Sequence, residues 1–140
     1  MACATGRRAL RSCVVLYELL AQHANLIRAV TIERFRAIET AHELRASITL
    51  RDGSVLHVRD YVFRDGTRKY AYHWQSRRGR LRRRWDNSGH WPALPSHPHH
   101  VHVGSATKVV ASSVRDLAGA LQAIAQTFQP TPARRRREGP

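Results

Sequence analysis

Two Asp-Gly pairs, at Asp52-Gly53 and Asp65-Gly66, constrain the fold of this chain more than any other feature. Each pair stands between runs of alternating apolar and polar residues. Such runs are typical of strands, and Asp-Gly between them is the strongest short-range signal for a turn joining two antiparallel strands. A third turn is indicated at Arg78-Gly79. The pattern therefore predicts an antiparallel meander of four to five strands that starts near Val30.

Helices are predicted at both ends of the meander. Apolar residues recur every three or four positions over about 9–22, which is typical of a helix with one apolar face. Near the C-terminus, Ser113-Val-Arg-Asp116 resembles a capping box, and an apolar stripe follows it as far as Phe128. We expect an α+β fold, in which an antiparallel meander sheet packs with an N-terminal and a C-terminal helix.

The length of 140 residues suits one domain. We expect an N-terminal arm and helix over 1–24, a single α+β domain over 25–128, and a basic disordered tail over 129–140. Residues 87–104 contain three prolines, so we expect irregular structure there. No apolar run approaches the roughly 18 residues of a membrane span, so no membrane partner is expected. Both cysteines precede residue 14, which argues against a disulfide framework and favours a cytoplasmic location.

The strand register decides which side chains share a face of the sheet. If both Asp-Gly turns are two-residue loops, Leu50 lies opposite Val55, and His57 lies opposite both Ile48 and Trp74. Each face is then apolar at one end and basic at the other, with the helices over the apolar parts. An error of one residue in any loop exchanges the faces beyond it.

Positive charge is concentrated in the middle of the sequence. The chain has 24 Lys+Arg and 10 Asp+Glu, giving a formal net charge of +14, and half of this excess lies within 61–104. Aromatic residues are interleaved there, which suits a polyanion that also offers flat bases. RNA, DNA and an acidic protein all fit this charge, and a solvated surface is the plain alternative. The predicted nucleic-acid-binding residues are Arg59, Lys69, Tyr72, Arg82, Arg83 and Trp85, although the aromatic members are more often core residues.

Five of the nine histidines fall within a window of thirteen residues, from His90 to His102. Histidine titrates near neutral pH, so two imidazoles can act as general base and acid in RNA cleavage while an arginine stabilises the phosphorane. Such a reaction requires no metal or other cofactor. The predicted catalytic residues are His73, Arg84, Asp86, His90, His99, His100 and His102. In this hypothesis His73 or His99 is the base or the acid, Arg84 holds the phosphate, and Asp86 orients an imidazole.

Two other interpretations of the histidines stay open. His97-Pro-His-His-Val-His102 has spacings that can point imidazoles at one divalent metal in a loop, but the strong zinc spacings are absent, so no metal ligand is assigned. Alternatively, the histidines are structural and cap turns or stack on Trp85 or Trp91. Other enzyme classes fit less well, because the sequence has no Gly-rich phosphate loop, no nucleophile elbow, and no carboxylate pair in its basic region.

Four segments carry a resemblance to a known family. In chain order they are Asp52-Gly-Ser-Val-Leu-His-Val-Arg-Asp-Tyr61, Lys69-Tyr-Ala-Tyr-His-Trp-Gln75, Arg83-Arg-Trp-Asp-Asn87 and Pro98-His-His-Val-His-Val-Gly104. They resemble the TumE family of toxin–antitoxin proteins over about 25–128. The resemblance implies a growth-inhibiting toxin whose partner is an antitoxin encoded nearby, and an acidic antitoxin would complement the positive charge.

Two departures of the chain from the family pattern concern its histidines. Trp91 stands where the family has a second histidine beside His90, and His97 stands where it has a phenylalanine. Combining the resemblance with the residues, we expect a toxin that inhibits growth by acting on RNA as a ribonuclease. The alternatives are a non-catalytic inhibitor that binds nucleic acid or the ribosome, and an inactive relative of a toxin. Whether the chain is an enzyme, and whether it forms homo-oligomers, stays open.

Overall fold

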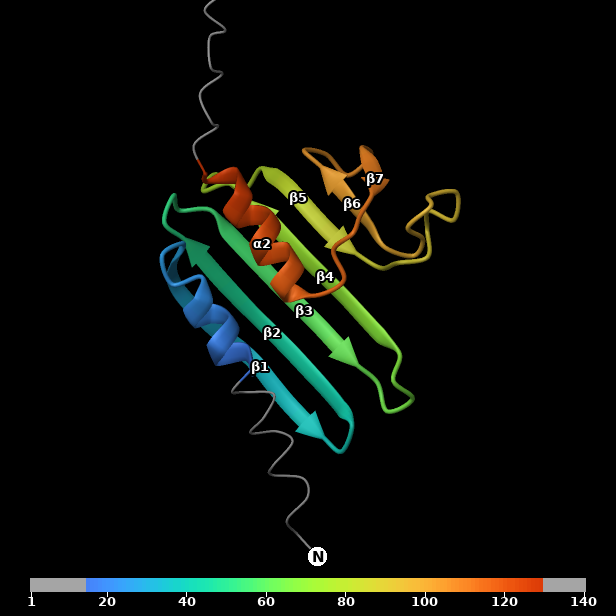
Figure 1. Ribbon diagram of the computed structural model, residues 1–140. Helices are drawn as coiled ribbons and strands as arrows, with labels where there is room; N and C mark the ends of the chain where they lie inside the picture. The colour runs from blue at the N-terminus through green and yellow to red at the C-terminus, as the bar shows by residue number, and fades with distance from the viewer. Residues whose placement is uncertain (1–14, 130–140) are drawn as a thin grey trace, which may run out of the picture.

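The computed structural model describes residues 15–129 of the chain. One antiparallel sheet of seven strands runs through them, and each strand lies beside its neighbours in sequence (Figure 1). The strands are β1 (Ile27–Ile38), β2 (Ala41–Leu50), β3 (Val55–Val62), β4 (Arg68–Gln75), β5 (Leu81–Asp86), β6 (His100–Val103) and β7 (Val109–Ala111). The predicted α+β class and antiparallel meander are confirmed, whereas the predicted number of four to five strands is wrong.

The two additional strands lie within and just beyond the segment in which we expect irregular structure. Residues 87–99 are irregular, as their prolines require. His100–Val103 contains no proline, and it pairs with β5 on one side and β7 on the other. Four residues are too few for the alternation of apolar and polar side chains to identify this strand, which directly follows a run of prolines and histidines.

Both helices lie on the same face of the sheet (Figure 1). The first covers residues 15–22 of the described chain, and α2 spans Leu117–Thr127. The carboxylate of Asp116 accepts a hydrogen bond from the Gly119 N–H at 2.8 Å, so Asp116 caps α2 and the predicted capping box at Ser113 is wrong. The start of the predicted first helix and the predicted tail after residue 129 lie outside the described residues. Neither described helix is long and apolar enough to cross a membrane.

The three hairpin loops each contain three residues, so the two-residue loops expected at the Asp-Gly turns are wrong. Each loop is closed by a hydrogen bond of 2.8–2.9 Å from an N–H to a carbonyl oxygen, in the pairs Leu50–Ser54, Phe63–Thr67 and Ser76–Arg80. Gly53, Gly66 and Gly79 occupy the last loop position with φ between +81° and +85°, a left-handed conformation that glycine adopts without steric cost.

The longer loops shift the predicted register by one residue. Ile48 lies opposite Leu56, and His57 lies opposite Ser47 on one side and His73 on the other. At the third hairpin a bulge next to Trp74 compensates for the odd loop, so Tyr72 and Trp85 share a face as predicted. Side chains alternate along a strand, so this shift moves every β3 side chain to the face opposite the predicted one. Leu56 thus shares a face with Ile48, and His57 shares the other face with Ser47.

The observed register gives the sheet one apolar face, which the helices cover. Ile48, Leu50, Leu56 and Tyr72 on the sheet, and Leu121 on α2, are at most 1 % exposed and belong to one core cluster. The predicted arrangement, with both faces apolar at one end and basic at the other, is therefore wrong. On the opposite face lie His57, His73, Arg84, His100 and His102, whereas His42 and Arg68 lie on the helix-covered face.

Replacing Gly66 by alanine tests the loop geometry. Gly66 has φ of +85° and open space where a Cβ would lie, so Gly66→Ala introduces backbone strain without a clash. We expect the free energy of unfolding to fall by about 1 kcal/mol. Gly89→Ala is the matched control, because Gly89 also has open space but no positive φ. Urea unfolding measures both variants, and an equal loss in the two would contradict the three-residue loop.

Candidate functional site

Two adjacent rows of mostly polar side chains, with Ala71 as the exception, cross the face of the sheet opposite the helices. Each row takes one residue from each of five neighbouring strands, and these residues lie directly opposite one another. The first row is Ser47, His57, His73, Arg84 and His102; the second is Arg45, Arg59, Ala71, Asp86 and His100. Because positions two residues apart project from the same side of a strand, both rows share one face, here called the open face.

A pocket of about 310 Å³ lies on the open face over β3, β4 and β5. It is lined by His57, Arg59, Ala71, His73, Gln75 and Arg84. The ring centroids of His57 and His73 are 6.2 Å apart, so the two imidazoles are direct neighbours in the pocket. The pocket thus combines two titratable rings with two guanidinium groups, a combination that suits an anion undergoing proton transfer.

A hydrogen-bond chain on the open face orients His57. Ser47 Oγ donates to Glu33 Oε1 at 2.9 Å and lies 3.3 Å from His57 Nδ1. Since the Ser47 proton goes to the carboxylate, its oxygen is left to accept from His57 Nδ1–H. In the neutral His57 ring the lone pair is then on Nε2, so Nε2 is the nitrogen that can gain and lose a proton.

His73 has the electrostatics of a general base. Burial lowers the pKa of His73 below its ordinary value of 6.5, and the nearby charges of Arg84 and His57 act in the same direction. The ring is therefore neutral at pH 7, which is the form that can accept a proton.

A second group of side chains, the Asp86–His100–His102 cluster, lies next to the pocket. Asp86 and His100 are buried, and His100 Nε2 lies 2.9 Å from Asp86 Oδ1, while His102 Nε2 lies 3.4 Å from Oδ2. Arg84 Nε donates to Asp86 Oδ2 at 3.2 Å and thereby links the cluster to the pocket. The ligand atoms of the cluster lie within 4.8 Å of one another, close enough to surround one ion.

Asp86 is charged at neutral pH although it is buried. Burial by itself raises the pKa of the carboxyl group, but hydrogen bonding from Ser88 and the charges of His100 and Arg84 outweigh it, so the pKa lies below its ordinary value. The Ser88 backbone N–H donates to Asp86 Oδ1 at 3.0 Å. The carboxylate is thus held in place from the loop that follows β5.

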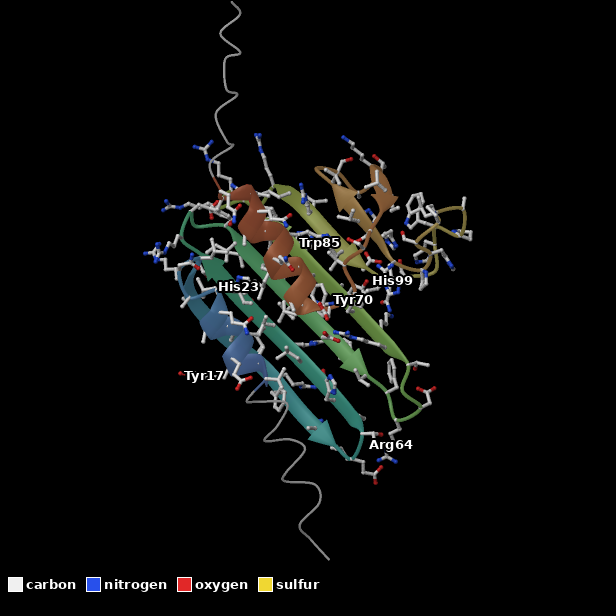
Figure 2. The ribbon with its side chains drawn as sticks, viewed as in Figure 1. Tyr17, His23, Arg64, Tyr70, Trp85 and His99 are labelled. Carbon is white, nitrogen blue, oxygen red and sulfur yellow. The ribbon has the colours of Figure 1, made fainter. Side chains whose placement is uncertain are left out.

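The structure does not bring every predicted catalytic residue to the open face. His73, Arg84, Asp86, His100 and His102 lie there together. His99 lies apart, because its Nδ1 is 2.7 Å from the hydroxyl of Tyr70 and its ring stacks on that core tyrosine (Figure 2). His90 is exposed in the loop after β5.

The predicted nucleic-acid-binding residues also divide between the two faces. Arg59 and Lys69 are exposed and project from the open face. Tyr72 and Trp85 are 0 % and 2 % exposed, so neither ring is available to stack on a base and the core interpretation fits both. Arg82 donates to Asp52 and lies over the ring of Trp74, and Arg83 lies opposite Trp74 across the β4–β5 pair.

His57 and Gln75 line the pocket but are not among the predicted site residues. In the predicted register, His57 lies opposite Ile48 and Trp74 rather than opposite His73. Three-residue loops ending in glycine are also common in hairpins, and that loop length would have put His57 opposite His73.

The comparisons with known proteins give one match. A family model described as Toxin TumE matches residues 16–129, which is most of the chain. No curated protein and no solved structure matches it.

Replacing Arg84 tests the electrostatics of the pocket. We expect the His73 ring to titrate below pH 6.5, and Arg84→Gln to move this midpoint to higher pH because a neighbouring positive charge is removed. Arg78→Gln, in an exposed hairpin loop, is the control and should leave the midpoint unchanged. Proton NMR of the ring resonances measures all three proteins. A wild-type midpoint above 6.5 would contradict the described environment of His73.

Proposed function

The chain belongs to the TumE family of toxins, and from this premise we propose that it is the toxin of a toxin–antitoxin system and inhibits growth by cleaving RNA. The observation that supports RNA cleavage most strongly is the open-face pocket, where the ring centroids of His57 and His73 are 6.2 Å apart and Arg59 and Arg84 line the same pocket. Two imidazoles and a phosphate-binding guanidinium are sufficient for cleavage of RNA by acid–base chemistry.

In the proposed reaction, His73 acts as the base and His57 as the acid. Neutral His73 removes the proton from the ribose 2′-hydroxyl, and the freed oxygen attacks the adjacent phosphorus. Protonated His57 donates its proton to the departing 5′-oxygen as the P–O bond breaks. The products are a 2′,3′-cyclic phosphate and a 5′-hydroxyl, so the choice of RNA over DNA follows from the need for the 2′-hydroxyl.

Arg84 is placed to hold the reacting phosphate. Its Nε donates to Asp86, while its terminal nitrogens form no hydrogen bond within residues 15–129. Its side chain is half-exposed and lines the pocket, so these nitrogens can donate to phosphate oxygens. Arg59 lines the same pocket from β3 and adds a second positive charge.

Substitution of the two histidines tests the proposed reaction. Purified protein is incubated with total RNA, and the fragments are analysed for cyclic phosphate ends. We expect His73→Ala and His57→Ala each to slow cleavage by about 100-fold or more, because each removes one proton-transfer step. His23→Ala is the control, because His23 directly follows the first helix and is not a pocket residue (Figure 2).

The outcomes separate the candidate functions. Cleavage at the wild-type rate by both pocket variants would overturn the acid–base assignment. If the wild-type protein forms no fragments yet stops translation, the non-catalytic inhibitor replaces the ribonuclease.

We also propose that an acidic antitoxin captures the protein with the help of long-range attraction. The formal net charge of +14 would raise the association rate with an acidic partner, and added salt would screen this attraction. We expect the association rate, measured by stopped flow with the antitoxin encoded nearby, to fall at least about tenfold between low salt and high salt. An unchanged rate would contradict electrostatic steering.

A further inference from the structure

Each histidine of the Asp86–His100–His102 cluster forms a hydrogen bond between its Nδ1 and a backbone carbonyl oxygen. His100 Nδ1 lies 3.0 Å from the carbonyl oxygen of Pro98, and His102 Nδ1 lies 2.8 Å from that of Ala106. A carbonyl oxygen only accepts hydrogen bonds, so both Nδ1 atoms carry a proton. In each neutral ring the lone pair is then on Nε2, and both Nε2 atoms face the carboxylate of Asp86.

His100 Nε2 has no hydrogen-bond partner. It is the only buried side-chain nitrogen or oxygen without one in the part of the chain that the structure describes, and His100 is 1 % exposed. The Asp86 oxygen is 2.9 Å away, yet the two atoms do not meet the geometry of a hydrogen bond. Two lone pairs and a carboxylate that converge in this way repel one another unless a cation, either a proton on Nε2 or a metal ion, lies between them.

The carboxylate of Asp86 has lone pairs left to bind a cation. Its Oδ1 accepts from the Ser88 N–H and its Oδ2 from Arg84 Nε. Each carboxylate oxygen has two lone pairs, so one on each remains toward the imidazoles. Histidines that bind metals typically donate their other ring nitrogen to a carbonyl or carboxylate, as His100 and His102 do here.

The register of the sheet builds this arrangement. His100 and His102 are two residues apart on β6 and therefore project from one face, and Asp86 lies directly opposite His100 on β5. The indole ring of Trp91 stands beside both imidazoles, with centroid distances of 6.4 Å and 6.3 Å. Three ligands are thus fixed by two paired strands and partly screened from solvent.

We propose that Asp86, His100 and His102 bind one divalent transition-metal ion through a carboxylate oxygen and the two Nε2 atoms. Two imidazoles and a carboxylate suit Zn²⁺ and its first-row neighbours, whereas Mg²⁺ and Ca²⁺ prefer oxygen ligands. Three protein ligands leave at least one position for water or a phosphate oxygen. The site is separate from the proposed acid–base pair, since neither His57 nor His73 is a ligand.

Zinc titration of the full-length, tag-free, metal-free protein tests this proposal. Isothermal calorimetry should give one Zn²⁺ per chain, and Zn²⁺ should raise the melting temperature because it binds the folded state. His102→Gln and Asp86→Asn should each weaken binding at least about tenfold and abolish the thermal shift. His23→Gln is the matched control, because it removes a histidine far from the cluster.

Two results would overturn the metal site. One is the absence of Zn²⁺ binding by the wild-type protein. The other is binding by His102→Gln and Asp86→Asn with wild-type affinity, which would place the ion elsewhere. Circular dichroism of each variant verifies that it is folded, and a visible absorption band of bound Co²⁺, present in wild type and His23→Gln alone, would support the assigned ligands. None of these measurements uses RNA, so failure of the metal site and failure of the proposed cleavage are distinguishable.

Discussion

The length of the hairpin loops is the constraint on which the rest of the structure depends. A glycine with positive φ ends each loop at its third residue, and the loop length fixes which residues of successive strands face one another. Because side chains alternate with a period of two, a loop of another parity would move His57 from the open face to the core face. The positions of Ser47, His57 and His73 on one face are thus a consequence of backbone geometry at the first two turns.

The helix-covered face supplies the rigidity that the open face requires. It is apolar apart from a few satisfied polar groups, of which buried Asp60 is the clearest case. Arg68 binds its carboxylate through Nε at 2.8 Å and through a second guanidinium nitrogen, and the hydroxyl of Tyr72 donates to it at 2.6 Å. With its charge compensated in this way, Asp60 fits into the core. Residues on the open face therefore project from strands whose opposite sides are fixed by packing.

Two centres of chemistry share the open face, and Arg84 lies between them. In the first row it separates His73 from His102, and its Nε bonds to Asp86. A phosphate bound by the terminal nitrogens of Arg84 would lie next to the acid–base pair on one side and the proposed metal cluster on the other. The acid–base pair lies on β3 and β4, whereas the ligands of the proposed metal site lie on β5 and β6. Substitutions can therefore remove the side chains of one centre and leave those of the other in place.

The sequence by itself determined the α+β class, the antiparallel order of the central strands and the two amphipathic helices, since these follow from local periodicity and turn residues. The hypothesis of an acid–base site grouped His73, Arg84 and Asp86 with the histidines at 100 and 102, but periodicity and turn residues did not place them on one face. Only the tertiary structure decided the loop parity, which separates Ile48 from His57 and places His57 opposite His73. Only the pairing of β6 with β5 decided that His99 faces the core while His100 meets Asp86. These placements depend on one-residue differences in register. Local propensity does not distinguish such registers, whereas the burial of a complete apolar face favours one of them.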